Sequence, residues 1–196
     1  MAQTAAEAPH RTRELLLEAG AEVAASEGLA GLSVNRVVAA AGVAKGTFYV
    51  HFPDREAFVD ALHERFHARV AEAVAEATRD TEPGAEQIWR GAEAYLDVCL
   101  EYPAIKALAL EARTEGALTS SMDDRHDRAT AAAVPGFRAM GWPDARAASQ
   151  LLSAMTAEIA IRELDAGRRL PAARRSLRRF LGVDDARASG KGKGRR

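Results

Sequence analysis

The sequence predicts an all-α protein of about nine helices, and two observations carry this prediction. Alanine dominates the composition, and 47% of the 196 residues are hydrophobic, which is enough to build a core. Apolar residues recur at spacings of three and four within segments of helical length, and glycine and proline separate these segments. We expect a flexible N-terminus over 1–9, a small helical domain over 10–54, a larger one over 55–182 and a basic, disordered tail over 183–196.

Local signals place the first two helices. The apolar spacing predicts a helix over about 10–27, with Gly28 as its stop. The hydroxyl of Ser33 can cap a second helix over 34–41, because it can accept a hydrogen bond from an orphan amide of the first turn. Gly42 ends that helix, and only two residues follow before the next helical segment. Two short helices joined by a tight glycine turn form a helix-turn-helix.

The segment GVAKGTFYVHF, residues 42–52, has two opposed interpretations. Polar and apolar residues alternate over 47–52, which by itself predicts a half-buried strand. The position directly after the tight turn favours a third helix instead, in which Phe48 and Phe52 lie one turn apart and face the core. The outward positions of this helix are then Lys45 and Tyr49, with Ala44, Thr47 and His51 in a neighbouring row.

Proline and glycine also divide the rest of the chain into helical segments. Asp54 can cap the fourth helix, and Pro143 is well placed as the first residue of the eighth. Pro135-Gly136 should kink or split the seventh. The fourth to ninth helices are expected over about 55–79, from 85 to before Pro103, onward to 115, and over 118–140, 143–166 and 172–181.

Charge is distributed unevenly along the chain. The formal net charge is -1, but residues 1–65 hold 6 basic and 9 acidic side chains, whereas residues 168–196 hold 11 basic and 2 acidic ones. If the N-terminal domain binds nucleic acid, a few well-placed residues must do so, because it carries no broad basic field.

The sequence indicates a soluble cytoplasmic protein. No signal peptide is recognisable at the start, and no candidate helix has the ~20 apolar residues that cross a bilayer. The single cysteine, Cys99, excludes an intrachain disulfide and a cysteine-based zinc cage, and fits a reducing compartment.

The run SVNRVVAAAGVAKGTFYVHFPDREAFVDAL, residues 33–62, resembles the N-terminal DNA-binding domain of the TetR family of bacterial transcriptional repressors. The similarity covers residues 10 to about 65 in organisation, and its most specific part is AGVAKGTFYVHFPDREAF, residues 41–58. Beyond residue 65 it extends only to the family's plan of a variable helical domain that binds a ligand and dimerises. The resemblance implies a transcriptional regulator and not an enzyme. It implies that the protein binds a palindromic double-stranded DNA operator as a homodimer and that a small-molecule effector regulates this binding.

The resemblance also implies roles for individual residues. It places a phosphate contact at Ser33 and at Arg55. Apart from the resemblance, Arg36 can either contact a phosphate or remain solvated on the second helix. Gly46 costs about 1 kcal/mol in a helix interior relative to alanine, and the gain would be a close approach to the major groove. On the recognition helix the implied DNA-binding residues are Lys45, Gly46, Thr47 and Tyr49, with His51 near the DNA backbone.

Two positions depart from the commonest family pattern. Ala44 stands where the family often has serine or threonine, so a helix cap and a phosphate contact are missing. Val50 stands where a polar or aromatic residue is frequent. Neither departure breaks the predicted fold, and whether they change which bases the recognition helix reads is an open question at this point.

Two rival functions have some support in the residues. HERFH, residues 63–67, matches the H-E-x-x-H pattern of zinc hydrolases, but a catalytic zinc needs three protein ligands and the third is not apparent. No metal site and no cofactor are therefore expected. The second rival is a binder of anionic surfaces, either nucleic acid or lipid, through the basic face and tail at the C-terminus. That face comprises Arg174, Arg175, Arg178 and Arg179.

The C-terminal helices supply candidates for dimerisation and for effector binding. The apolar stripe of the eighth and ninth helices predicts a four-helix dimer interface, unless it packs only within its own subunit. Aromatic and apolar residues of the middle helices either line an effector pocket or form ordinary core. The interface candidates are Leu151, Leu152, Met155, Ile159, Leu177 and Phe180. The pocket candidates are Trp89, Tyr95, Cys99, Tyr102, Met122, Phe137 and Met155.

Overall fold

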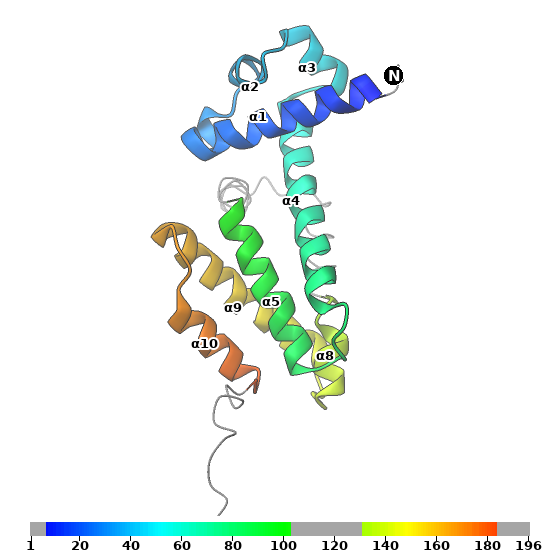
Figure 1. The fold of residues 1–196 in the computed structure, drawn as a ribbon, viewed down its shortest axis with the longest axis vertical. Coiled ribbons are helices and arrows are strands. Elements are labelled where there is room, and N and C mark those ends of the chain that lie inside the picture. The colour runs from blue at the N-terminus through cyan, green and yellow to red at the C-terminus, as the bar shows by residue number, and fades with distance from the viewer. Residues whose placement is uncertain (1–6, 103–130, 184–196) are drawn as a thin grey trace, which may run out of the picture. The chain divides into compact units, whose positions relative to one another are not determined.

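Helices make up the fold of the computed structural model, which describes residues 7–102 and 131–183 (Figure 1). No strand occurs among these residues, so the predicted all-α class is confirmed. The sixth expected helix and the start of the seventh lie outside the described residues. In chain order the helices are α1 (Glu7–Gly31), α2 (Val34–Ala41), α3 (Lys45–His51), α4 (Arg55–Thr78), α5 (Ala85–Glu101), α8 (Val134–Ala139), α9 (Ala145–Ala166) and α10 (Pro171–Phe180).

The described residues fall into two compact units. The first unit comprises 7–72 and 98–102, and the second comprises 73–97 and 131–183. The first unit therefore contains α1, α2, α3 and most of α4. The second contains most of α5 together with α8, α9 and α10.

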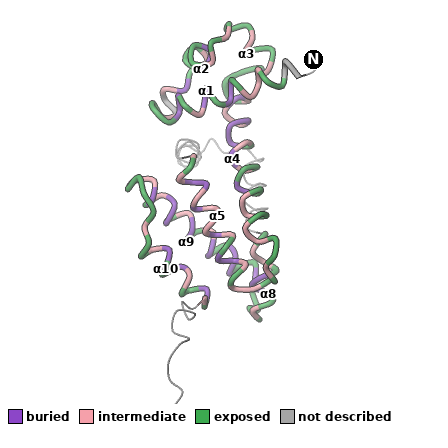
Figure 2. The backbone as a smooth tube through the Cα atoms, viewed as in Figure 1, coloured by how far each residue is buried: buried purple, intermediate pink, exposed green. Residues whose placement is uncertain are grey.

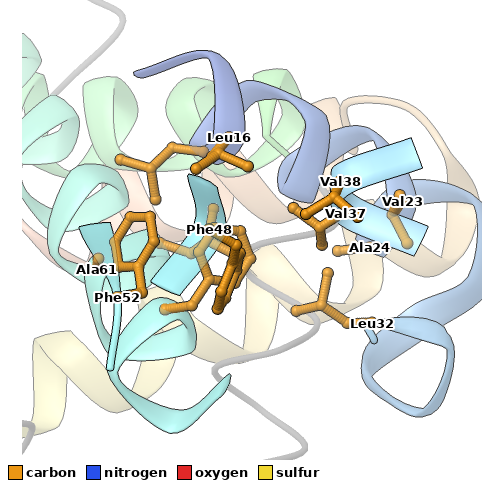
Figure 3. Packing of buried hydrophobic residues seen from close by; sticks show 12 residues of the cluster. Leu16, Val23, Ala24, Leu32, Val37, Val38, Phe48, Phe52 and Ala61 are labelled. Atoms are coloured by element: carbon orange, nitrogen blue, oxygen red, sulfur yellow. The ribbon is translucent and has the colours of Figure 1, made fainter. Parts of the chain in front are cut away.

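Phe48 is the centre of the first unit's core (Figure 3). Its side chain is fully buried, and its ring lies 5.4 Å from the ring of Phe52 and 5.2 Å from that of Phe58, measured between centroids. Figure 3 shows Leu16 above it, and the valines of α2 beside it. Aromatic side chains bury large areas and pack with tilted or edge contacts, so this cluster fixes the short α3 against α1, α2 and α4.

The turns around α2 and α3 have the residues that their geometry needs. Ser33 accepts a hydrogen bond from the amide of Arg36 at 3.4 Å, which confirms the predicted cap. Gly42 has a φ of 67°, and the amides of Gly42 and Val43 donate to the carbonyls of residues 39 and 38. This is a Schellman motif, for which glycine is favoured because a Cβ disfavours positive φ. Ala44 gives α3 no side-chain cap, as expected.

The first helix is interrupted where the sequence predicted its end. Gly28 was expected to stop it, and its backbone is non-helical, with a φ of 67° and a ψ of -170°. The bounds of α1 extend to Gly31 because a short second helical segment follows this kink.

Helix α1 lies unusually close to α4. A Cβ built on Gly20 would be 2.4 Å from Cζ of Phe58, so only glycine fits there without a shift. Arg65 of α4 adds ion pairs to Glu14 at 3.3 Å and to Glu18 at 3.4 Å on α1. The first part of α4 and the helix-turn-helix are thus packed as one body within the first unit.

The second unit is built on close contacts of α5. Gly136 of α8 lies against Ile88 of α5, since an added Cβ would meet the Ile88 side chain at 2.7 Å. The chain forms a turn at 132–133, directly before α8. Of the two expectations near Pro135, a kink or a split of the helix, the described residues therefore show a split. Helix α9 begins at Ala145, so Pro143 lies in the preceding turn and is not the first helical residue.

A buried ion-pair network holds α10 to α9 and α5. Arg174 donates two hydrogen bonds to Glu163, at 2.8 and 2.7 Å, and a third to Asp97 at 2.6 Å. The Glu163 side chain is fully buried and that of Arg174 is 7% exposed. Asp97 also pairs with Arg169 at 2.9 Å, and the amide of Leu170 donates to Glu163 at 2.8 Å.

This network corrects the predicted basic face of the last helix. Arg174 was expected on a solvated side, but its guanidinium is inside the second unit. Arg178 is half-buried, with its guanidinium carbon 6.0 Å from the centre of the Trp89 ring. Helix periodicity alone assigned the wrong side because it does not reveal an acidic partner on another helix. Only Arg175 and Arg179 of the four are exposed.

Candidate nucleic-acid interface

The outward side of α3 is the candidate interface, and it is held from behind by Phe48. Figure 2 shows α3 largely exposed, while buried residues lie on α1 and the first turns of α4. The Tyr49 ring packs edge-on against the Phe48 ring at 5.4 Å yet remains 49% exposed. Tyr49 is therefore oriented by the core while its phenol is available to a partner. This combination suits recognition, because little side-chain entropy is lost on binding.

Most of the predicted recognition-helix residues are accessible. Lys45, Gly46 and Tyr49 are exposed, and Thr47 and His51 are half-buried. The helix presents an ammonium, a bare stretch of backbone and a phenol on one continuous side. Such groups can bind phosphate oxygens and approach base edges.

The three predicted residues outside α3 are partly engaged within the first unit. Ser33 caps α2 but is exposed. Arg36 forms an ion pair with Glu27 of α1. Its guanidinium is therefore not simply solvated, and a phosphate would have to compete with the Glu27 carboxylate for it. Arg55 donates its Nε hydrogen to the carbonyl of Leu32 at 2.6 Å, which ties the start of α4 to the turn before α2.

Val50 is an accessible residue that was not among the predicted contacts. Its side chain is 79% exposed, the highest exposure among the large hydrophobic residues that the structure describes as exposed. The sequence marked Val50 only as a departure from a family pattern. Its outward direction could have been found from its spacing of two residues from Phe48, which on a helix places it on the opposite side.

The predicted dimer residues divide into two groups. Leu152, Ile159 and Leu177 are buried within the chain itself, so their side chains contribute to the second unit's own core. The exposed candidates are Leu151 at 64%, Met155 at 38% and Phe180 at 77%.

The predicted pocket residues also differ in how far they are buried. Trp89 and Phe137 are buried in the second unit, and Cys99 is buried as well. Tyr95 and Tyr102 are half-buried, whereas Met155 is exposed. Met122 lies outside the described residues.

The rival functions find no support in the described parts of the chain. His63 of the HERFH motif is 1% exposed and is one of the buried residues of α4. Over residues 7–102 and 131–183, no three His, Cys, Asp or Glu side chains come together as a group that could hold a metal ion. For the predicted binding of anionic surfaces, Arg174 is not accessible, because it is buried in the ion pair with Glu163. No described helix is long and apolar enough to cross a membrane.

Comparisons with known proteins identify the helix-turn-helix region. The family profile of the tetR family of bacterial regulatory proteins matches residues 16–62. The transcriptional repressor NemR of Escherichia coli K12 is 39% identical over 59 residues, which is 30% of each chain. The transcriptional repressor DhaR of Mycobacterium sp. GP1 is 34% identical over 68 residues, 35% of this chain and 34% of that one. The aligned part thus spans about a third of the length of these curated relatives.

Solved structures extend the similarity of fold to most of the chain. A TetR-like transcriptional regulator from Rhodococcus sp. RHA1 has a TM-score of 0.74 at 19% identity, covering 87% of this chain and 93% of its own. The fatty acid degradation regulator FadR from Bacillus halodurans has a TM-score of 0.75 at 18% identity, covering 89% and 96%. The family profile and the curated relatives are thus similar to the helix-turn-helix region, whereas the solved structures are similar in fold over most of the chain. Residues 16–62 therefore match the tetR family of bacterial regulatory proteins, and most of the chain has a fold similar to that of a TetR-like transcriptional regulator.

Proposed function

We propose that the chain is a ligand-responsive transcriptional repressor that binds a palindromic DNA operator as a homodimer. The observation that carries this proposal is the outward side of α3, where Lys45, Gly46 and Tyr49 are exposed while Phe48 is buried behind them. A helix held rigidly at this position can enter the major groove, and its charged and hydroxyl groups can bind phosphates and base edges.

The charge of the first unit supports a selective mode of DNA binding. Few basic residues lie in residues 1–65, and three of them, Arg13, Arg36 and Arg65, already pair with glutamates. Non-specific attraction to phosphate should therefore be weak, and affinity should depend on contacts that fit one sequence. We expect a shallow salt dependence relative to strongly basic DNA-binding domains.

A homodimer follows from the limited reach of one helix-turn-helix. One recognition helix reads only a few base pairs, so useful specificity needs two copies on half-sites separated by a multiple of the helical turn. The exposed side chains of Leu151 and Phe180 are the candidate contacts between copies. Replacing each by aspartate should shift the full chain from dimer to monomer in analytical ultracentrifugation, and an unchanged dimer in both variants would place the interface elsewhere.

The regulatory step of the proposal is a displacement of α4 by an apolar or amphipathic effector. Within the first unit, Gly20 packs directly on Phe58 and Arg65 pairs with Glu14, so a movement of the first part of α4 would carry the helix-turn-helix with it. An effector that binds one arrangement better than the other would shift the dimer away from the spacing that fits the operator.

The test is a footprint of the full chain on the DNA flanking its own gene. The wild type should protect a palindromic, dimer-sized region, and Tyr49→Ala should lose this protection. Tyr49→Phe is the matched variant, because it removes only the phenol hydroxyl and keeps the ring on Phe48. Persistent protection by Tyr49→Ala would reject α3 as the recognition element.

A further inference from the structure

Gly46 and Val50 form the outermost line of α3. At about 100° of rotation per residue in an α-helix, both positions lie roughly 160° around the axis from Phe48, whereas Lys45 lies about 60° and Tyr49 about 100° from it. The exposures agree with this geometry, since Phe48 is fully buried, Tyr49 is 49% exposed and Val50 is 79% exposed. The point of closest approach to a docked partner is therefore between Gly46 and Val50.

The fold does not account for either residue. A Cβ added at Gly46 would meet no atom within 4 Å, so packing does not require glycine there. Glycine weakens a helix relative to alanine, and a β-branched residue such as Val50 loses side-chain freedom in one. One exposed valine needs no explanation by itself, but here it adjoins a bare turn of backbone on the same line of one short helix.

The chemistry of a valine limits what it can bind in DNA. Its side chain has no donor or acceptor, so placing it against a phosphate or a polar base edge would leave those groups unpaired. The major groove offers one apolar group on its base edges, the 5-methyl group of thymine. Gly46, one turn earlier, lets the helix backbone approach closely enough for the short isopropyl group to reach the groove floor.

We infer that Val50 determines sequence specificity by packing against the 5-methyl group of a thymine in each operator half-site. This inference rests on the proposed DNA-binding function and adds the base that the site selects. Lys45 and Tyr49 flank the line and provide the polar contacts that orient the helix. Val50 thereby contributes discrimination, although it contributes no hydrogen bond.

The experiment uses DNA that differs by one methyl group. Operator duplexes are selected by the full-length chain from a random-sequence pool, and each thymine of the selected sequence is then replaced in turn by deoxyuridine. Burial of one methyl group corresponds to about a fourfold change in affinity per half-site. We therefore expect one symmetry-related thymine position at which deoxyuridine weakens wild-type binding about fourfold in one half-site, and roughly 15-fold when both are replaced.

Variants at position 50 connect the methyl group to this side chain. Val50→Ala should bind the thymine operator more weakly and should no longer distinguish thymine from deoxyuridine at that position. Val50→Thr keeps one methyl group in nearly the same shape and should retain part of the discrimination. Because Val50 is 79% exposed, neither change should affect folding.

Three results would overturn the inference. If no deoxyuridine replacement weakens wild-type binding, no thymine methyl group is read. If wild type and Val50→Ala are weakened equally, another residue reads it. Both results leave the proposed function intact, provided that Tyr49→Ala still abolishes operator binding. If no sequence is enriched from the pool, the proposed function fails, and this inference fails with it.

Discussion

Arg174→Met should strongly destabilise the second unit, because Arg174 is the cation of its buried ion-pair network. The substitution removes three hydrogen bonds, two to Glu163 and one to Asp97. Asp97 keeps its ion pair with Arg169, but Glu163 keeps only the amide of Leu170. Removing one partner of a buried ion pair costs about 3–5 kcal/mol, because a charge is left uncompensated in the interior.

The pH dependence gives this prediction a second signature. Burial raises the pKa of the Glu163 carboxyl, but hydrogen bonds from Arg174 and the Leu170 amide outweigh it, so the pKa lies below its usual value. The wild type thus gains stability from this carboxylate above the unfolded-state pKa of about 4.3, and loses it as the pH falls through the folded-state pKa. In the variant that gain is absent. The difference in unfolding free energy should be largest near pH 7 and should narrow below about pH 4.

Urea unfolding followed by tryptophan fluorescence is the suitable assay. Trp89 and Trp142, the two tryptophans of the chain, both lie in the second unit and report on it directly. With a denaturant slope of about 2 kcal/mol/M, the midpoint should fall by roughly 1.5–2.5 M at fixed protein concentration. Arg175→Met is the matched control, since Arg175 is the exposed neighbour on the same helix. Equal midpoint shifts in the two variants would refute the buried network.

Three further substitutions test the packing and the caps. Gly46→Ala should raise the melting temperature by about 2–4 °C, because the helix gains up to about 1 kcal/mol. The same substitution should weaken operator binding, and unchanged affinity in a gel-shift titration would contradict a close approach of the α3 backbone to the DNA. Gly20→Ala should lower stability by about 1–3 kcal/mol, since its Cβ would lie 2.4 Å from Phe58, and a higher melting temperature would be incompatible with that contact. Asp54→Ala should cost about 1 kcal/mol in chemical unfolding by losing the hydrogen bond from the Ala57 amide at 2.8 Å, whereas Asp54→Asn should cost little.

The helix-turn-helix could be predicted in detail because its signals are local. The Ser33 cap, the turn at Gly42 and the pair Phe48 and Phe52 all act within a few residues of themselves. Alternation over 47–52 favoured a strand, and the tight turn before it gave the correct helix. A short periodic run decides little, whereas its position after a turn decides more.

The buried network could not be predicted because its partners are distant in sequence. Arg174 meets Glu163 eleven residues away and Asp97 seventy-seven residues away. Four arginines on one side of a helix indicate a solvated face unless the packing of other helices is known. The same limit applied to the apolar stripe, whose members Leu152 and Leu177 proved to be buried within the chain while Leu151 is exposed.

The outward line of α3 was only partly recognised for a related reason. Family resemblance directed attention to Lys45 and Tyr49, and it treated Val50 as a departure. Exposure and rotation about the helix axis place Val50 further from the core than either of them. A departure from a family pattern at an exposed position is therefore a candidate for specificity.

The central claim is that the outward side of α3 meets DNA, and one comparison of affinities tests it most directly. Val50→Glu and Ala71→Glu add the same charge at exposed positions of the first unit, on α3 and α4 respectively. A carboxylate against the groove should cost several kcal/mol, so Val50→Glu should bind the selected operator at least about 100-fold more weakly than the wild type. Ala71→Glu should remain within about threefold, because its charge is screened from the DNA. Equal losses in the two variants, or wild-type affinity in Val50→Glu, would contradict the account.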